Sequence, residues 1–326
     1  MLYQLYQLTG KKICKEWGTK VADDFIKNQF DDGYWSNNKP LPHGQSEIEF
    51  GSELKNRDKI GTQLSRINRE VEEMNNRRFE DKVAIVTGAG RSMGRATAHT
   101  LAAGGAGVVV NDVVQARADA VVDEITKAGG KALALVADIS DLSQVQQMTQ
   151  SAVEHFGTVD FLINNAGILR TTSPLEEIDD AEWDLMMAIN VKGAFNCTKV
   201  VLPIMKAKRG GKIVNVSSSA GRSTSTFGGA HYTTAKAAIL GLTRHTAREA
   251  APYNINVNAV APGSMDTEMV SELATPEHME SERQGIPLGR LGTAQDEANL
   301  VAFLCSEESA YIAGATIDIN GADLLI

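Results

Sequence analysis

A tyrosine and a lysine four residues apart, Tyr232 and Lys236, are the side chains in this 326-residue sequence best suited to moving a proton. Residues four apart on a helix lie on one face, about one turn from each other. A phenol has a reference pKa of about 10, and a nearby ammonium stabilises the phenolate. The pair therefore predicts a general acid or base for an alcohol or a ketone. The hydroxyl of Ser218, which follows an apolar run, would hold the substrate oxygen and stabilise its developing charge.

A glycine-rich turn lies upstream of these residues, directly after the apolar run 83–87. Glycines let the backbone turn tightly and let a diphosphate approach, and the helix that follows offers N–H groups to that anion at its N-terminus. Because the turn follows a buried strand, it predicts a dinucleotide site rather than a plain tight turn. The residues assigned to this site are Gly88, Arg91, Ser92, Met93 and Gly94.

Two charged residues near this turn favour different cofactors. Asp112 stands 24 residues after Gly88, where a carboxylate accepts hydrogen bonds from both ribose hydroxyls and repels a 2′-phosphate. Arg91 favours NADP, because a guanidinium in the turn attracts that phosphate. A like-charge clash excludes a ligand more strongly than one exposed cation attracts it. We therefore predict NAD as the cofactor and NADP as the less favoured alternative.

Apolar strands alternate with helical stretches from Val83 to the C-terminus. Strands that are apolar throughout are typical of parallel sheets buried on both faces. The alternation predicts an α/β fold, a doubly wound (Rossmann) parallel sheet of about seven strands. Ligands bind beyond the carboxyl ends of such strands, where the glycine turn and Ser218 would both lie. The expected strands are 83–87, 108–111, 132–137, 161–164, 212–217, 255–261 and 317–319.

From about Phe79 to the end, the sequence resembles the short-chain dehydrogenase/reductase family, of the type with a core near 250 residues. The resemblance covers a domain at 79–326 and rests on several motifs that occur in the family's order. These are the glycine turn, Asp138, Asn164-Asn165-Ala166-Gly167, Asn190, Ser218, Tyr232-x-x-x-Lys236 and Pro262-Gly263.

The resemblance implies a role for each motif residue away from the proton-transfer pair. Asp138 would hydrogen-bond the adenine ring. Asn164 and Gly167 would form the wall beside the cofactor. Asn190 would hold a water molecule in a proton relay, although an asparagine there could simply close a helix.

At the nicotinamide end, the resemblance implies further cofactor contacts. Pro262 and Gly263 would border the nicotinamide ring, and Thr267 would hold its carboxamide. Tyr232 and Lys236 would also contact the cofactor, with the lysine gripping the nicotinamide ribose.

The sequence departs from the family pattern at two serines. The family's second glycine in the turn is Ser92 here, which would either crowd the diphosphate or help to bind it. Counting thirteen residues back from Tyr232 selects Ser219 as the catalytic serine, whereas counting back from Gly221 selects Ser218. We favour Ser218, because a strand end fixes its direction while the loop 222–230 can absorb an insertion.

Together these residues predict an oxidoreductase that transfers a hydride between NAD(H) and a secondary alcohol or ketone. The alternatives are a non-catalytic NAD-binding sensor or scaffold, and a structural protein without cofactor. Related carrier-protein ketoreductases use an arginine after the long helix, whereas residues 251–254 read Ala-Pro-Tyr-Asn, so an acyl-carrier partner is disfavoured. The resemblance alone implies a homotetramer.

Bulk properties exclude several other classes of protein. The net charge is −9 and no dense basic run occurs, so no nucleic-acid partner is expected. No apolar run is long enough for a membrane span, and no secretory signal is expected. Cys14, Cys197 and Cys305 are far apart, so we expect no disulfide or zinc site and a cytoplasmic location.

Two further segments have predicted roles. Residues 1–78 are polar with scattered aromatics, and helices are expected near 1–29 and 63–76. A subunit-docking arm is favoured over a substrate cover or a poorly ordered segment, because five aromatics are many for a disordered tail. Residues 264–287, with Met265, Met269 and Met279, would form a lid by resemblance.

Overall fold

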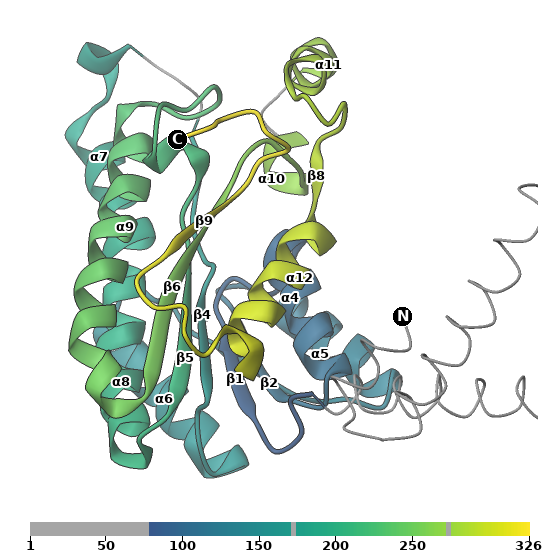
Figure 1. Cartoon of the computed structure of the whole chain (residues 1–326), viewed down its shortest axis with the longest axis vertical. Coiled ribbons are helices and arrows are strands. Elements are labelled where there is room, and N and C mark those ends of the chain that lie inside the picture. Colours follow the sequence, from purple (N-terminus) through teal and green to yellow (C-terminus); the bar gives the residue numbers. More distant parts are fainter. Residues whose placement is uncertain (1–77, 171–173, 272–274) are drawn as a thin grey trace, which may run out of the picture. The chain divides into compact units, whose positions relative to one another are not determined.

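The computed structural model describes residues 78–170, 174–271 and 275–326. Seven parallel strands form one sheet in the order β3-β2-β1-β4-β5-β6-β9, which confirms the doubly wound sheet (Figure 1). The helices expected near 1–29 and 63–76 lie outside the described residues. The strands are β1 (Val83–Val86), β2 (Gly107–Asp112), β3 (Lys131–Val136), β4 (Phe161–Asn164), β5 (Gly211–Val216), β6 (Ile255–Pro262) and β9 (Thr316–Ile319).

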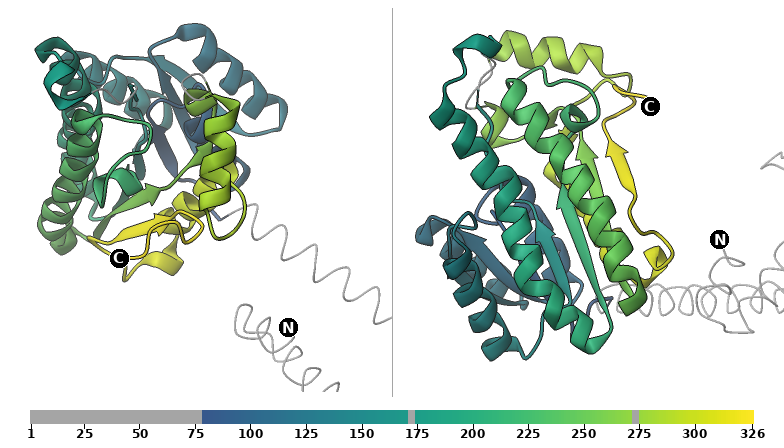
Figure 2. Two further views of the ribbon diagram at one scale, coloured as in Figure 1. Left: turned by 90° about the horizontal axis from the view of Figure 1, so that it is seen from above. Right: turned by 90° about the vertical axis from the view of Figure 1, so that its left-hand side faces the viewer.

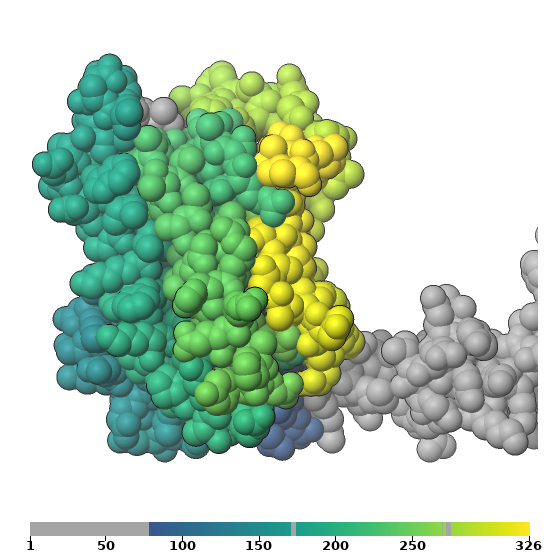
Figure 3. Space-filling view, turned by 60° about the vertical axis from the view of Figure 1, so that its left-hand side comes forward, coloured from purple at the N-terminus to yellow at the C-terminus, as the bar shows by residue number. Residues whose placement is uncertain are grey.

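Helices cover both faces of this sheet. One face carries α4 (Ser92–Ala103), α5 (Gln115–Lys127) and α12 (Ala294–Cys305). The other carries α6 (Leu142–Phe156), α8 (Ala194–Lys208) and α9 (Ala230–Ala250), and the second view of Figure 2 looks onto it. The space-filling view shows α8 and α9 forming a broad surface beside the C-terminal segment (Figure 3).

The strands are apolar throughout because each one serves two cores. Successive strand residues point to opposite faces of a sheet. Ala84 and Val86 of β1 therefore belong to the core under α4, α5 and α12, while Ile85 belongs to the core under α6, α8 and α9. Every residue of β1 and β2 is buried.

The strand order reverses between β1 and β4, which pair in parallel with Val86 opposite Ile163. The chain runs outward from β1 to β3, then returns to the other side of β1 for β4 and its successors. The loops after β1 and β4 diverge at this point, and ligands bind in the crevice that such a reversal creates.

Between β4 and α8 the chain forms α7 (Asp180–Met187) and a π-helix, η2 (Ala188–Gly193). After β6 it forms α10 (Glu268–Ser271) and α11 (Pro276–Gly285), and α11 stands above the carboxyl ends of the strands in Figure 1. β7 (Met265–Asp266) and β8 (Gly292–Thr293) pair as a small second sheet. This sheet was not predicted, because two-residue strands are too short to carry a periodic pattern.

Candidate active site

The glycine turn is shaped for a close backbone approach. Gly88 has a φ of +62°, and a Cβ atom there would lie 2.8 Å from Ala166 Cα. A Cβ atom on Gly94 would lie 2.3 Å from the Gly88 carbonyl oxygen. Both positions therefore require glycine, and the turn leads directly into the N-terminus of α4, where backbone N–H groups face an incoming anion. This cradle fits the diphosphate of a dinucleotide.

Ser92 occupies the left-handed region with a φ of +50°, which is unfavourable for a residue other than glycine. Its hydroxyl donates a hydrogen bond to Glu268 Oε2 at 3.0 Å, so the turn is joined to the start of α10. α4 begins at Ser92, and Arg91, which has an extended backbone, serves as its N-cap.

Asp112 lies at the end of β2, against the glycine turn. Its Oδ2 accepts a hydrogen bond from Gly90 N at 3.2 Å, and its Oδ1 accepts one from Val114 N at 2.9 Å. These two bonds hold a buried carboxylate beside the turn. This is the place where the ribose of an adenosine meets the second strand of a dinucleotide-binding sheet.

The ends of β1 and β4 are tied together by side chains. Thr87 Oγ1 accepts hydrogen bonds from Asn165 N and Ala166 N, both at 3.1 Å. Asn165 Nδ2 donates to the carbonyl oxygens of Thr87 at 2.8 Å and Gly88 at 3.1 Å. Asn165 thus fixes the glycine turn and lines the central cavity.

Asn164 does not occupy the position that the sequence analysis assigned to it. Its side chain is buried and donates to Thr198 Oγ1 at 3.1 Å and Asn215 Oδ1 at 2.8 Å, within the layer under α8. Strand side chains alternate between faces, so Asn165 rather than Asn164 faces the cavity. The same alternation could have indicated this from the sequence.

Asp138 and Asn190 both shape loops near the site. Asp138 is exposed, and its Oδ1 accepts hydrogen bonds from the backbone N–H of Ser140 at 2.9 Å and from its hydroxyl at 2.8 Å. Asn190 is buried in η2; its Oδ1 accepts from Ile168 N at 2.8 Å, and its Nδ2 donates to Ile168 O at 2.9 Å. π-helical turns are frequent at functional sites. A Cβ atom on Gly167 would lie 2.6 Å from Asn190 Oδ1, so the glycine permits this packing.

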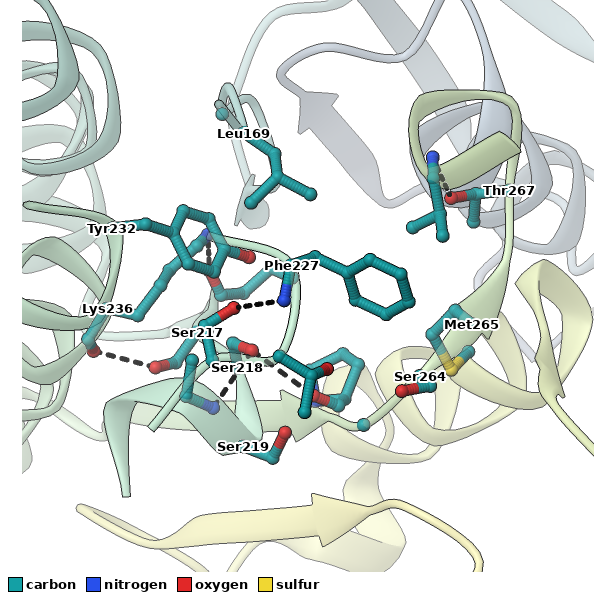
Figure 4. Close-up of a pocket in the computed structure, with 18 of the residues that line it drawn as sticks. Leu169, Ser217, Ser218, Ser219, Phe227, Tyr232, Lys236, Ser264, Met265 and Thr267 are labelled. Atoms are coloured by element: carbon teal, nitrogen blue, oxygen red, sulfur yellow. Dashed lines mark hydrogen bonds between the residues drawn. The ribbon is translucent and has the colours of Figure 1, made fainter. Parts of the chain in front are cut away.

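The predicted catalytic residues meet at a cavity of about 140 Å³ beyond the carboxyl ends of the strands (Figure 4). The predicted residues that line it are Met93, Gly167, Ser218, Ser219, Tyr232, Lys236, Pro262, Gly263 and Thr267. Lining residues that the sequence analysis did not assign to the site include Leu169, Phe227, Val270 and Asp323.

Lys236 and Tyr232 lie on one face of α9, as their spacing predicts. The Lys236 ammonium lies 5.7 Å from the centre of the Tyr232 ring and donates to Val216 O at 3.0 Å. Burial lowers the pKa of Lys236 to about 8. Burial raises the pKa of Tyr232, and a hydrogen bond with Ser218 opposes that rise. From the sequence we expect the lysine to lower the pKa of the phenol, whereas in the structure burial raises it.

Ser218 has the geometry expected of the serine that contacts Tyr232. It ends the strand segment as the N-cap of a short 3₁₀ turn, η3 (Ser219–Gly221), and its Oγ accepts from Ala220 N at 3.1 Å. Ser219 also lines the cavity, yet the hydrogen bond that affects the Tyr232 pKa involves Ser218.

A buried carboxyl group on α12, Glu297, was missed by the sequence analysis. Its side chain is 0% exposed, and neither carboxyl oxygen has a hydrogen-bond partner within the described residues. Burial raises the pKa of Glu297 to about 8, and the positive charge of Lys236 opposes this rise. No sequence pattern near Glu297 marked it, because acidic residues in the first turn of a helix are common.

An aromatic contact closes one side of the cavity. Ser225 Oγ accepts from Phe227 N at 3.2 Å and Gly228 N at 2.7 Å, which fixes the loop that carries Phe227. The Phe227 ring stacks on His278 of α11, with centroids 4.6 Å apart and planes at 17°. This stack joins the loop after β5 to α11, which lies within the segment 264–287 that the resemblance predicts to be a lid.

The described part of the chain contains no cluster of three metal-ligating side chains, and none of its helices meets the length and apolarity needed to cross a bilayer. Cys197 and Cys305 are buried and unpaired, and burial raises the pKa of both thiols to about 12. Cys14 lies outside the described residues.

A doubly wound parallel sheet, a glycine cradle for a dinucleotide, and a serine, tyrosine and lysine around one cavity define an oxidoreductase that uses a nicotinamide cofactor. The chain belongs to the short-chain dehydrogenase/reductase family. The family model described as Enoyl-(Acyl carrier protein) reductase matches residues 88–321.

Individual relatives support this membership. The chain is 39% identical to the 3-oxoacyl-(acyl-carrier-protein) reductase FabG of Thermotoga maritima over 245 residues, which cover 75% of this chain and 98% of the relative. It is 42% identical to FabG of Staphylococcus aureus over 241 residues, which cover 74% and 97%. A solved 3-oxoacyl-(acyl-carrier protein) reductase from Brucella melitensis with bound NAD superposes with a TM-score of 0.71 at 32% identity, covering 77% of this chain and 94% of that one.

Proposed function

We propose that this protein transfers a hydride between NAD(H) and a secondary alcohol or ketone. The observation that carries the proposal is the convergence of Ser218, Tyr232 and Lys236 on a cavity bordered by Pro262 and Gly263. A bound nicotinamide supplies or accepts the hydride, and the side chains of this cavity handle the oxygen atom and its proton.

The three side chains divide that work. In the reducing direction, the Ser218 hydroxyl donates a hydrogen bond to the carbonyl oxygen, and the Tyr232 phenol donates its proton to that oxygen as it gains charge. The raised pKa keeps the phenol protonated and ready to donate. The Lys236 ammonium, which is protonated below a pH of about 8, then stabilises the phenolate.

The preference for NAD rests on Asp112. Two backbone hydrogen bonds hold this carboxylate beside the glycine turn, so it cannot easily move away from a 2′-phosphate. The NAD in the Brucella melitensis reductase is consistent with this preference.

We further propose a small-molecule substrate rather than a carrier-bound one, although the relatives are named for acyl-carrier substrates. At the corner after α9, residues 251–254 read Ala-Pro-Tyr-Asn and carry no cation. Arg209 donates to Pro252 O at 3.1 Å, and Lys206 pairs with Glu249 at 2.7 Å. Residues 251–254 therefore offer no positive charge of their own to an acidic carrier.

The proposed homotetramer has a candidate contact on α7, η2, α8 and α9. Met187, Val191, Phe195 and Leu242 line an apolar groove there, and Phe195 is 46% exposed. Light scattering of the purified protein should give four times the chain mass, and Phe195→Lys should lower it.

The test of the reaction is NADH oxidation with a panel of ketones, followed by absorbance at 340 nm. Tyr232→Phe should reduce kcat at least about 100-fold, the usual contribution of general acid catalysis. Tyr253→Phe is the matched control, because Tyr253 packs against Lys206 outside the cavity. Tight NADH binding without turnover of any ketone would favour the sensor or scaffold instead.

A further inference from the structure

Apolar side chains form part of the cavity walls near the hydroxyls of Ser218 and Tyr232. Leu169, Phe227, Met265 and Val270 line the cavity. Figure 4 shows Met265 on the opposite side of the Phe227 ring from Tyr232. A carbonyl oxygen held between Ser218 and Tyr232 directs the substituents of its carbon against these walls. Apolar groups gain most from such burial, because no polar group of theirs loses water.

Phe227 presents a fixed aromatic surface within these walls. Its backbone is held by Ser225 Oγ, and its ring is backed by the stacked His278 ring. In Figure 4 the Phe227 ring reaches between Tyr232 and Thr267. A ring restrained in this way favours a flat partner, because offset stacking and edge contacts add to the burial of area.

Two carboxyl groups lie in or beside the cavity lining. Asp323 lines the cavity, and Ser264, another lining residue, donates to Glu282 Oε2 at 2.6 Å. His278 Nε2 lies 3.6 Å from Glu282 Oε1, so that imidazole faces the carboxylate.

Within the described lining, the sole cationic side chain is Lys236, which is buried and donates to Val216 O. Arg170 follows Leu169 but is exposed and does not line the cavity. An anionic substrate would therefore meet the Asp323 carboxylate, while the Lys236 ammonium is buried and engaged with Val216 O, and such like-charge contact rejects a ligand.

We propose that the substrate is an uncharged ketone or alcohol with a flat apolar substituent, which Phe227 contacts and which the carboxylate of Asp323 selects against anionic analogues. This inference rests on the proposed function of the same site and adds the class of substrate.

The charge part is tested with three compounds that share one keto group: ethyl acetoacetate, acetoacetate and acetoacetyl-coenzyme A. We expect kcat/KM for the neutral ester to exceed that for either anion by about tenfold or more. Asp323→Asn should raise kcat/KM for acetoacetate about threefold and leave the ester within about twofold. Asp266→Asn is the control, because that exposed carboxylate on β7 does not line the cavity.

The contact between Phe227 and a flat substituent is tested by comparing acetophenone with butanone in the same variant. An effect of the substitution on the lid segment alters kcat/KM for both ketones and cancels in their ratio. Phe227→Leu should lower kcat/KM about tenfold for acetophenone and about twofold for butanone, mainly through KM. Phe227→Tyr keeps the ring and should retain the preference for acetophenone.

These outcomes distinguish a failure of the proposed function from a failure of the proposed substrate class. If no ketone is reduced by the wild type, the proposed function itself fails. If ketones are reduced through Tyr232 but acetoacetate or acetoacetyl-coenzyme A equals the neutral ester, the charge selection is overturned and the reaction stands. An unchanged ratio of acetophenone to butanone in Phe227→Leu overturns the aromatic contact.

Discussion

Glu297 and Lys236 are buried on helices that pack against opposite faces of β5 and β6, and each shifts the pKa of the other. The carboxylate favours the protonated lysine, and the ammonium favours the ionised carboxyl group. Lys236, which lines the cavity, is thus coupled to a residue that does not line it.

The first prediction concerns the pH dependence of ketone reduction. In the proposed mechanism, reduction requires protonated Lys236, so kcat/KM should fall as pH rises through about 8. Glu297 itself ionises near pH 8, where its charge raises the pKa of Lys236, so Glu297→Gln should move the fall to lower pH. The measurement is kcat/KM from pH 6 to 10.

Glu307→Gln serves as the control for that profile, because it removes an exposed charge just after the same helix. Coincident profiles for the wild type and Glu297→Gln would mean that the carboxyl group does not act on the catalytic lysine.

The second prediction concerns stability. The pKa of Glu297 is raised from 4.5 to about 8 in the folded state, so the folded state retains a proton that the unfolded chain loses above about pH 4.5. The free energy of unfolding should therefore fall between about pH 4.5 and 8 because of this group. Glu297→Leu removes that cost, which is on the order of a few kcal/mol.

Thermal unfolding at several pH values measures this effect. The gain in Tm for Glu297→Leu over the wild type should be small near pH 5 and largest near pH 9. A gain that is constant across that range would show improved packing alone.

The third prediction concerns the glycine cradle. Gly88→Ala forces a side chain into a φ of +62° and places its Cβ 2.8 Å from Ala166 Cα, so NADH binding should weaken at least about tenfold. Gly129→Ala is a matched control, because Gly129 has a φ of +87° with nothing within 4 Å of the added atom. The control should lose about 1 kcal/mol of stability and retain NADH affinity. Equal affinities for the two variants would contradict the placement of the diphosphate.

The fourth prediction concerns the choice of cofactor. Asp112→Ala removes the carboxylate that opposes a 2′-phosphate, so the ratio of the Kd for NADPH to that for NADH should fall at least about tenfold. Asp138→Ala should leave this ratio unchanged, because Asp138 closes the loop after β3. Isothermal titration with both cofactors measures the ratio, and a wild type that already prefers NADPH would refute the role of Asp112.

Much of this arrangement follows from the sequence, since β-branched runs set the strands and Gly88 marks the turn. The spacing of Tyr232 and Lys236 places them together because both belong to one helix. Short-range patterns of this kind depend only on residues that are near in the sequence, so the sequence alone is enough to predict them.

The remaining features depend on contacts between distant segments. The stacking of Phe227 on His278 joins residues from a loop and from α11, and no local pattern predicts which aromatic residue meets which. Glu297 is charged, so composition alone places it at the surface, yet the packing of α12 on the sheet buries it. The pKa directions of Tyr232 and Lys236 likewise reflect burial, which spacing does not reveal.

The hydrogen bonds between Thr87 and Asn165 hold the ends of β1 and β4 in a fixed register. One hydroxyl and one amide join the strand that leads into the diphosphate cradle to the strand that leads into the substrate wall. These hydrogen bonds therefore fix the glycine turn and the start of the substrate wall relative to each other in the middle of the sheet. The distance between the glycine turn and the cavity wall at Asn165 is therefore set by the pairing of two neighbouring strands.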